Sequence, residues 1–242
     1  MHFSFMLSGW KELERRSRLN DLSWMNSQAF LISVTLLTYL GLLIGVLGLY
    51  NWKKLSQPFR FFSVLWILTS LNEIVRDILM SRGINPNHTG IINSLMKLVL
   101  FFFIYFLAFQ KPALKWPFII LMACLLLFEI SFWVYDGAQS KSIFILAVNS
   151  AALLSLCLYH FYELIKNPVT HVLNIPMFWI STGLIISMSA SVILYATNHY
   201  LYPILKDDLI DLWSFRNYLT VGSYGFFLYA LWLEVKMSPA QT

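Results

Sequence analysis

Glu73, Arg76 and Asp77 place three ionisable side chains inside a stretch of the chain that is otherwise apolar. Their spacing of three and four residues puts them on one face of a helix. A charge near the middle of a lipid-facing helix costs roughly 2.5–3.5 kcal/mol on insertion scales. We therefore expect these side chains to face a protein interior or a wet cavity, where they pair with other charges or bind a polar ligand.

The composition around this stretch is typical of an integral membrane protein. Of the 242 residues, 58% are hydrophobic and 12% are charged, whereas soluble domains carry about 25% charged residues. Seven apolar runs recur, each long enough to cross a hydrocarbon core of roughly 30 Å. The runs cover residues 28–50, 59–80, 89–109, 117–135, 142–162, 177–199 and 212–233. We predict an all-α fold, a polytopic membrane protein built as a bundle of seven transmembrane helices.

The predicted domain organisation is a single transmembrane domain with two short tails. The seven-helix domain covers residues 28–233, and the C-terminal tail covers 234–242. The N-terminal tail over 1–27 is polar, and one interpretation is that translation begins at Met25, just ahead of the first run. The loops between the runs are short, which leaves no room for a soluble catalytic domain.

Lysine and arginine residues are divided unevenly between the two sets of loops. One side holds Lys53, Lys54, Arg60, Lys111, Lys115, Lys166 and Lys236, and the other holds Arg82, Lys141 and Lys206. Basic loops favour the cytoplasm, so we predict a cytoplasmic C-terminus and an N-terminus outside. Counting the four basic residues of the N-terminal tail would make the two sides equal. The formal charge of +5 is scattered through loops and does not indicate a nucleic-acid partner.

Small residues recur at four-residue spacing in two of the runs. Gly41 and Gly45 lie in the first run, and Gly183, Ser187 and Ser191 lie in the sixth. Rows of small residues let helix backbones approach closely in membrane bundles. We therefore predict close helix packing along both rows.

Polar residues from five of the runs fall at a similar depth below one membrane face. At 1.5 Å rise per residue, Asp77 and Arg216 lie about 5 Å below that face, and the deeper members lie about 9–12 Å below it. The predicted ligand-binding set is Glu73, Arg76, Asp77, Asn93, Lys97, Glu129, Asn149 and Arg216. The cytoplasmic half of the sequence offers no comparable set.

Balanced charge at matched depth indicates ion pairing between the runs. We expect Glu73 to pair with Lys97 and Asp77 to pair with Arg216, because an isolated buried charge is costly. Three interpretations remain open at this point. The layer fixes helix register and binds nothing, or it lines an outward-opening cavity for a small ligand or ion, or its shallower residues contact lipid headgroups.

Motifs for catalysis, metals and cofactors do not occur in the sequence. It has no paired histidines at HxxxH or HExxH spacing, no GxSxG nucleophile motif and no glycine-rich phosphate loop. The last run also lacks the lysine that a retinal Schiff base needs. We therefore predict no catalytic residue, no metal site and no cofactor.

Two stretches resemble the seven-helix membrane modules of bacterial sensor proteins. They are Ile-Pro-Met-Phe-Trp-Ile-Ser-Thr-Gly at 175–183 and the N-E-x-x-R-D run at 72–77. The resemblance implies a receptor-like, non-enzymatic signalling role in the bacterial inner membrane. The implied partners are the lipid bilayer, a small ligand or ion and a separate cytoplasmic signalling protein. The alternatives are a small-solute or ion transporter or channel, and an intramembrane lipid-modifying enzyme.

Overall fold

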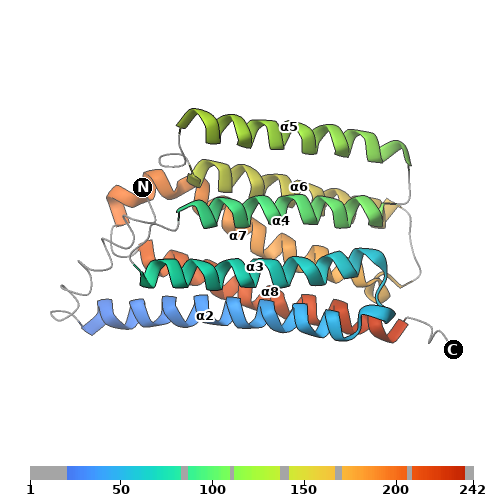
Figure 1. Cartoon of the computed structure of the whole chain (residues 1–242), viewed down its shortest axis with the longest axis horizontal. Coiled ribbons are helices and arrows are strands. Elements are labelled where there is room, and N and C mark those ends of the chain that lie inside the picture. The colour runs from blue at the N-terminus through green and yellow to red at the C-terminus, as the bar shows by residue number, and fades with distance from the viewer. Residues whose placement is uncertain are drawn as a thin grey trace.

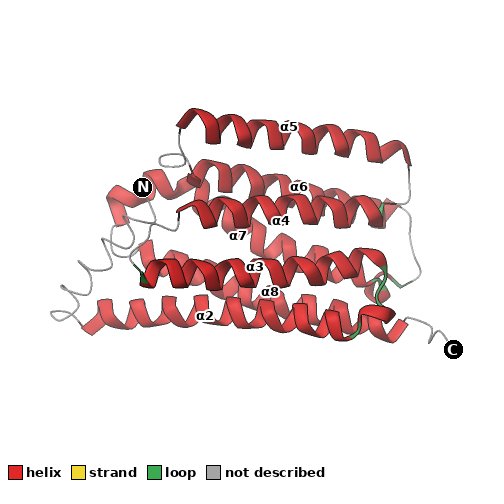
Figure 2. Cartoon of the chain, viewed as in Figure 1, coloured by secondary structure: helices red, strands yellow, loops and turns green. Residues whose placement is uncertain are grey.

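The computed structural model describes residues 21–82, 87–109, 112–136, 142–166, 171–205 and 209–237. Seven α-helices occupy these ranges: α2 (Asp21–Tyr50), α3 (Gln57–Ser81), α4 (Asn87–Ala108), α5 (Pro112–Asp136), α6 (Ser142–Lys166), α7 (Pro176–Leu205) and α8 (Leu209–Met237). Two short 3-10 helices, η1 (Trp52–Lys54) and η2 (Val172–Asn174), precede α3 and α7. The regular structure in these ranges is entirely helical (Figure 2), so the predicted all-α fold is confirmed.

Four of the helices are long and apolar enough to cross a membrane. The spans are Gln28–Tyr50, Thr89–Ala108, Ile143–Lys166 and Pro176–Asn198. The chain is therefore a helical membrane protein. The expectation of seven crossings is not confirmed, because α3 and α8 carry several charged residues and the apolar stretch described in α5 is short.

The helices lie side by side, and each runs opposite to its predecessor in the chain (Figure 1). The ends of α2, α4, α6 and α8 therefore share one end of the bundle with the starts of α3, α5 and α7. We call this the C-terminal end, because α8 finishes there, and we call the other the opposite end. Helix α7 packs between α6 and α8, and α2 packs against α3 and α8. Helix α5 forms one edge of the bundle and packs mainly on α4 (Figure 1).

The predicted runs correspond to the seven helices. Helix α2 begins at Asp21, and its apolar span begins at Gln28, where the first run was predicted to begin. Helix α8 continues to Met237, four residues past the end of the last predicted run, and the predicted domain bounds stay predictions. Residues 1–20 and 238–242 lie outside the described ranges, and the proposed start at Met25 stays a prediction.

An aromatic core fills the middle of the bundle between α3, α4 and α8. The Trp66 ring meets the Tyr224 ring edge-on at 4.7 Å between centroids, and Phe62 meets Phe227 edge-on at 5.5 Å. All four side chains are buried, as is Phe101 from α4. Such aromatic pairs add about 0.5–1.5 kcal/mol each beyond their buried area.

The predicted rows of small residues do bring helix backbones together. A Cβ atom added to Gly45 would lie 3.0 Å from the backbone nitrogen of Ile67, so α2 and α3 are in close contact there. A Cβ atom on Gly183 would lie 3.0 Å from the carbonyl oxygen of Ser223, where α7 meets α8. The prediction of close packing is confirmed for both rows.

The tightest of these approaches gives a direct test of the α2–α3 contact. A Cβ atom on Gly48 would lie 1.8 Å from Ser63 Oγ and 2.5 Å from Ser63 Cβ. We expect Gly48→Ala to lower the free energy of unfolding by about 1–3 kcal/mol, the usual cost of overpacking. Unfolding in detergent micelles measures it. Gly222→Ala is the matched control, because nothing lies within 4 Å of its Cβ position. Equal stability of both variants would contradict the close contact.

Candidate functional site

Most of the predicted site residues lie at one level of the bundle. Counted from the helix ends at 1.5 Å per residue, this level is about 9–15 Å from the opposite end. Its members are Glu73, Asn93, Lys97, Glu129, Asn149 and Arg216. Arg76 and Asp77 lie nearer the opposite end, at about 8 Å and 6 Å.

Glu73 is the most heavily engaged of these side chains. Asn93 Nδ2 of α4 donates a hydrogen bond to Glu73 Oε1 at 2.5 Å. Arg76, one turn along α3, forms an ion pair with Glu73 Oε2 at 2.6 Å. Close by, Asn72 Nδ2 donates to the carbonyl oxygen of Thr89 at 2.9 Å, which also joins α3 to α4. Glu73 therefore contributes to the contact between these two helices, with Arg76 beside it on the face that the spacing predicted.

The two predicted ion pairs are wrong. Among the described residues, the ion pairs of this region join Arg76 to Glu73 and, at 3.8 Å, to Asp77. Arg76 lies three residues from Glu73 on the same helix, so the two side chains can pair without any contact between helices. Asn93 of α4 bonds to the other carboxyl oxygen of Glu73. Asp77 is not drawn toward Arg216, because 54% of its side chain is exposed at the edge of α3.

Lys97 lies close to several charges without bonding to any of them. Its ammonium interacts electrostatically with Glu73, Arg216 and Arg76. In the part of the chain that the structure describes, it makes no ion pair within 4.0 Å and no hydrogen bond. Tyr224 of α8 interacts with the same Glu73 and Arg216. The half-buried Lys97 of α4 therefore lies near charged groups of both α3 and α8.

Arg216 is held by neutral groups from two helices. Its Nε donates to Ser191 Oγ of α7 at 3.0 Å, and its two terminal nitrogens donate to Asn217 Oδ1 at 3.0 Å and to the Tyr195 hydroxyl at 3.2 Å. The guanidinium also lies over the Tyr195 ring. Asn217 in turn donates to Ser33 Oγ of α2 at 3.1 Å. Arg216 thus stands at the junction of α7, α8 and α2.

Glu129 and Asn149 form a second, separate group beside α5. Asn149 Nδ2 of α6 donates to Ser94 Oγ of α4 at 2.8 Å, and the Glu129 carboxyl lies beside the Asn149 side chain. Both oxygens of Glu129 and Oδ1 of Asn149 are buried without a hydrogen-bond partner. The structure therefore divides the predicted layer into a charged group around Glu73 and an acceptor-rich group around Glu129.

A third polar group, near the C-terminal end, corrects the expectation that this half has no comparable set. Hydrogen bonds join Ser181 Oγ to the Tyr105 hydroxyl at 2.8 Å and to His160 Nδ1 at 2.9 Å. The Tyr105 hydroxyl also donates to Cys157 Sγ at 3.3 Å. We define Tyr105, Cys157, His160 and Ser181 as the Ser181 network. The sequence places His160 and Ser181 in this half, but spacing within one helix gives no signal for their contact with Tyr105 of α4.

The Ser181 network contains a serine hydroxyl bonded to an imidazole, which is the arrangement of a nucleophile with its base. Ser181 has no exposed surface, and His160 is 6% exposed. The rings of Tyr105 and Phe109 also pack against the His160 ring, at 5.4 Å and 5.9 Å between centroids. A substrate has no route to this serine in the described structure, so we interpret the network as a tie between α4, α6 and α7.

Comparisons with known proteins give no family for this chain. No protein-family profile matches it, and no curated protein or solved structure matches it. The resemblance to bacterial sensor modules therefore stays a prediction from two short stretches of sequence. In the described residues, no three histidine, cysteine, aspartate or glutamate side chains are grouped so that they could hold a metal ion. The contacts around Lys97, Arg216 and Glu129 are the remaining guide to function.

Proposed function

We propose that this protein is a receptor-like, non-enzymatic membrane module that binds a small ligand in the opposite half of its bundle. Lys97 is the observation that carries the proposal. This ammonium is surrounded by charged side chains of α3 and α8 and has no bonded partner of its own in the described residues. A charge inside a helix bundle is costly when nothing bonds to it, and Lys97 is a half-buried side chain of this kind. A ligand that bonds to Lys97 would remove that cost.

The charges around Lys97 favour a ligand with an anionic group. Both oxygens of Glu73 are already occupied, by Arg76 and by Asn93. Among the described residues, the hydrogen bonds of Arg216 go to neutral partners. Lys97 and Arg216 repel each other electrostatically, and in the described structure neither cation has a bonded anion. A carboxylate or phosphate between them would accept charge-assisted hydrogen bonds, which are roughly twice as strong as neutral ones.

The same contacts suggest how binding would change the bundle. A ligand that attracts the Arg216 guanidinium competes with Ser191 of α7 and with Asn217, which links α8 to Ser33 of α2. Ligand binding would then favour a bundle in which α8 sits differently between α7 and α2, as a shift between two states. At the C-terminal end, Glu234 of α8 accepts a hydrogen bond from the Ser56 backbone nitrogen at 2.9 Å. A movement of α8 would therefore reach the loop between α2 and α3.

We further propose that all seven helices cross a bacterial inner membrane, with the C-terminus in the cytoplasm. Three of the charges that set α3 and α8 apart from the four apolar helices have partners in the bundle: Arg76 pairs with Glu73, and Arg216 bonds to α7. Inward, partnered charges are the kind that membrane helices tolerate. In this orientation the exposed Lys53 and Lys54 of η1 would meet a cytoplasmic signalling protein.

The carrier alternative requires a polar route through the whole bundle. Between Lys97 and the Ser181 network, α4 presents the buried Leu98 and Phe101, and α7 presents the buried Leu184. This apolar middle favours a receptor over a carrier. Cysteines introduced at Ser187 and Leu184 would separate the two, because in a carrier a water-soluble thiol reagent labels them from each side in turn.

Lys97→Met tests the proposed ligand site. Purified protein in nanodiscs would be titrated with a fixed panel of small carboxylates, inorganic phosphate, phosphate monoesters and matched amines, with the thermal midpoint as the readout. We expect anionic members to raise the midpoint, and Lys97→Met to weaken their binding by about 10- to 100-fold, the worth of one charged hydrogen bond. Lys236→Met is the matched control, since this exposed lysine lies over the Trp232 ring at the C-terminal end.

Two results would contradict this proposal. One is stabilisation by the amines and not by the acids, which would reverse the charge of the ligand. The other is unchanged binding of the anionic members in Lys97→Met together with reduced binding in Lys236→Met, which would move the site to the C-terminal end.

A further inference from the structure

Helix α5 buries an acid and exposes its apolar side chains. Glu129 is 3% exposed, and in the described part of α5 it is the only side chain that is buried. Its apolar neighbours Leu127 and Ile130 are 65% and 52% exposed. An ionisable residue on a membrane helix marks a functional site by default. The inward position of Glu129 therefore calls for a physical reason.

The carboxyl group of Glu129 lies beside the Asn149 side chain without a hydrogen bond to it. Among the described residues, neither of its two oxygens has a hydrogen-bond partner, and neither has Asn149 Oδ1. Asn149 is 2% exposed, and its amide nitrogen donates one of its two hydrogens to Ser94 Oγ at 2.8 Å. Three buried oxygens of these two side chains are thus left without a hydrogen bond. Burying an ionised carboxylate in this way costs several kcal/mol.

No described charge on the neighbouring helices compensates Glu129. On α4, Lys97 interacts with Glu73, Arg76 and Arg216 instead. On α6, the ionisable side chains begin with Cys157 and continue toward the C-terminal end through Tyr159, His160, Tyr162, Glu163 and Lys166. Cys157 is already eight residues from Asn149, about 12 Å along the helix axis. On α5 itself, the nearest described ionisable side chain is the exposed Cys124.

We propose that Glu129 is a proton-binding site in the interior of the bundle. The carboxyl group holds a proton and donates it in a hydrogen bond to Asn149 Oδ1. This hydrogen bond gives a partner to one carboxyl oxygen of Glu129 and to Asn149 Oδ1. The proton itself neutralises the buried carboxylate. The bonds then run from Glu129 of α5 to Asn149 of α6 and on to Ser94 of α4. The site is independent of the ligand proposed at Lys97.

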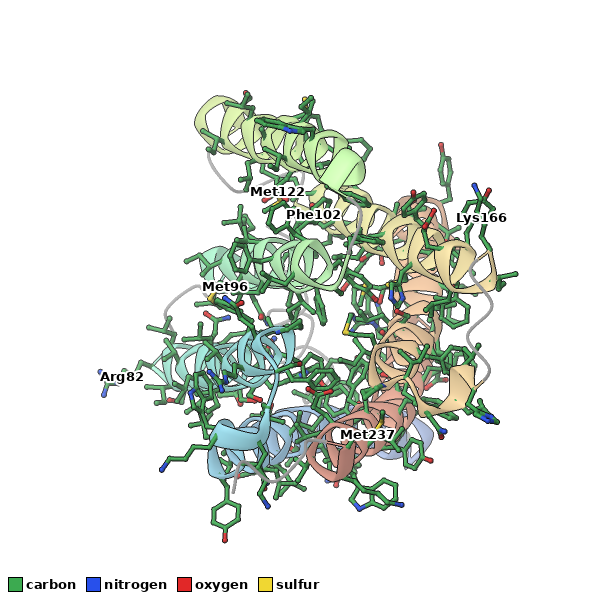
Figure 3. The ribbon with its side chains drawn as sticks, turned by 90° about the vertical axis from the view of Figure 1, so that its right-hand side faces the viewer. Arg82, Met96, Phe102, Met122, Lys166 and Met237 are labelled. Carbon is green, nitrogen blue, oxygen red and sulfur yellow. The ribbon has the colours of Figure 1, made fainter. Side chains whose placement is uncertain are left out.

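The proton would control how one half of α5 attaches to the bundle. Toward the C-terminal end, α5 is held by rings: Phe118 stacks on Phe109 at 4.9 Å and packs on Tyr159 at 5.8 Å. Midway, Met122 of α5 and Phe102 of α4 lie in the space between the two helices (Figure 3). These contacts do not depend on charge. Loss of the proton would place a bare carboxylate against Asn149, and so would loosen only the half of α5 nearer the opposite end.

Infrared spectroscopy of the whole chain in nanodiscs detects the proton directly. At neutral pH we expect the carbonyl stretch of a hydrogen-bonded, protonated carboxylic acid, and we expect Glu129→Gln to abolish it. Asp77→Asn is the matched control and should leave the band unchanged, because Asp77 is a half-exposed acid at the edge of α3. Asn149→Leu should move the band to the frequency of a free carboxylic acid. If Glu129→Gln fails to fold, the shift of the band in Asn149→Leu still tests whether Glu129 holds the proton.

Three outcomes would overturn the assignment. The first is the absence of the band from the unmodified protein at neutral pH. The second is a band that persists in Glu129→Gln or does not move in Asn149→Leu. The third is loss of the band when sodium chloride replaces potassium chloride at constant pH, because the site would then take a sodium ion in place of the proton.

Discussion

Replacing Glu73 by alanine is expected to lower the free energy of unfolding by about 2–3 kcal/mol, because a partly buried ion pair and a hydrogen bond between two helices are lost together. Arg76 loses its closest carboxylate and Asn93 loses the acceptor of its amide hydrogen bond. Among the described residues, Glu73 is also the anion that attracts Lys97, and its loss leaves Lys97 repelled by Arg76 and Arg216. Denaturant titration of the purified protein in micelles measures the loss.

Two further variants show that the loss comes from the charge of Glu73. Asp77→Ala is the matched control, and it should change stability by less than about 1 kcal/mol, because its contact with Arg76 is 3.8 Å long and half-exposed. Combining Glu73→Ala with Lys97→Met should recover about 0.5 kcal/mol or more, since the second change removes a repelled cation. Strictly additive losses would contradict the electrostatic connection between Glu73 and Lys97.

Ser181→Ala is expected to lower the free energy of unfolding by about 2–3 kcal/mol. Ser181 is fully buried, and its hydroxyl serves both His160 Nδ1 and the Tyr105 hydroxyl. Its removal leaves the imidazole nitrogen without this partner, and each buried polar group left unsatisfied costs about 1–3 kcal/mol. Tyr105 retains its contact with Cys157 Sγ, which limits the loss. The same denaturant titration in micelles gives the value.

The neighbouring Thr182 provides the control for Ser181. Its hydroxyl bonds only to the Phe178 carbonyl oxygen of its own helix, at 2.9 Å. Thr182→Ala should therefore lower the free energy of unfolding by well under half as much as Ser181→Ala does. If the two variants lost equal stability, the tie between α4, α6 and α7 would not depend on the Ser181 network.

The two halves of the bundle differ in a way that bears on function. Around Ser181, polar groups bond to one another and are enclosed by rings. In the described residues of the other half, the half-buried Lys97 has no bonded partner, and buried oxygens of Glu129 and Asn149 make no hydrogen bond. Native proteins leave few buried polar atoms unsatisfied, so unmade bonds indicate where a ligand or a proton binds. This contrast places the proposed chemistry in the half of the bundle away from the C-terminal end.

The sequence by itself determined the helices and their approximate depth in the bundle. Apolar runs of membrane-spanning length leave a chain little choice but helix, because in lipid every backbone group must bond within its own segment. Counting residues from the run ends was therefore enough to place Glu73, Glu129 and Asn149 at one level. The spacing of Gly45 and Gly183 from other small residues likewise predicted which helix faces approach closely.

Only the tertiary structure decided which of these side chains meet. Depth along a helix follows from a fixed rise per residue, but pairing depends on how each helix is rotated and which partner is nearest. Glu73 bonds to Arg76 on its own helix and not to Lys97, and Arg216 bonds to neutral groups of α7 and not to Asp77. The rotation of α5 about its own axis also turns Glu129 toward the interior of the bundle, although most residues of this helix are apolar. Those choices arise from packing between segments far apart in the chain, which residue spacing within one segment does not encode.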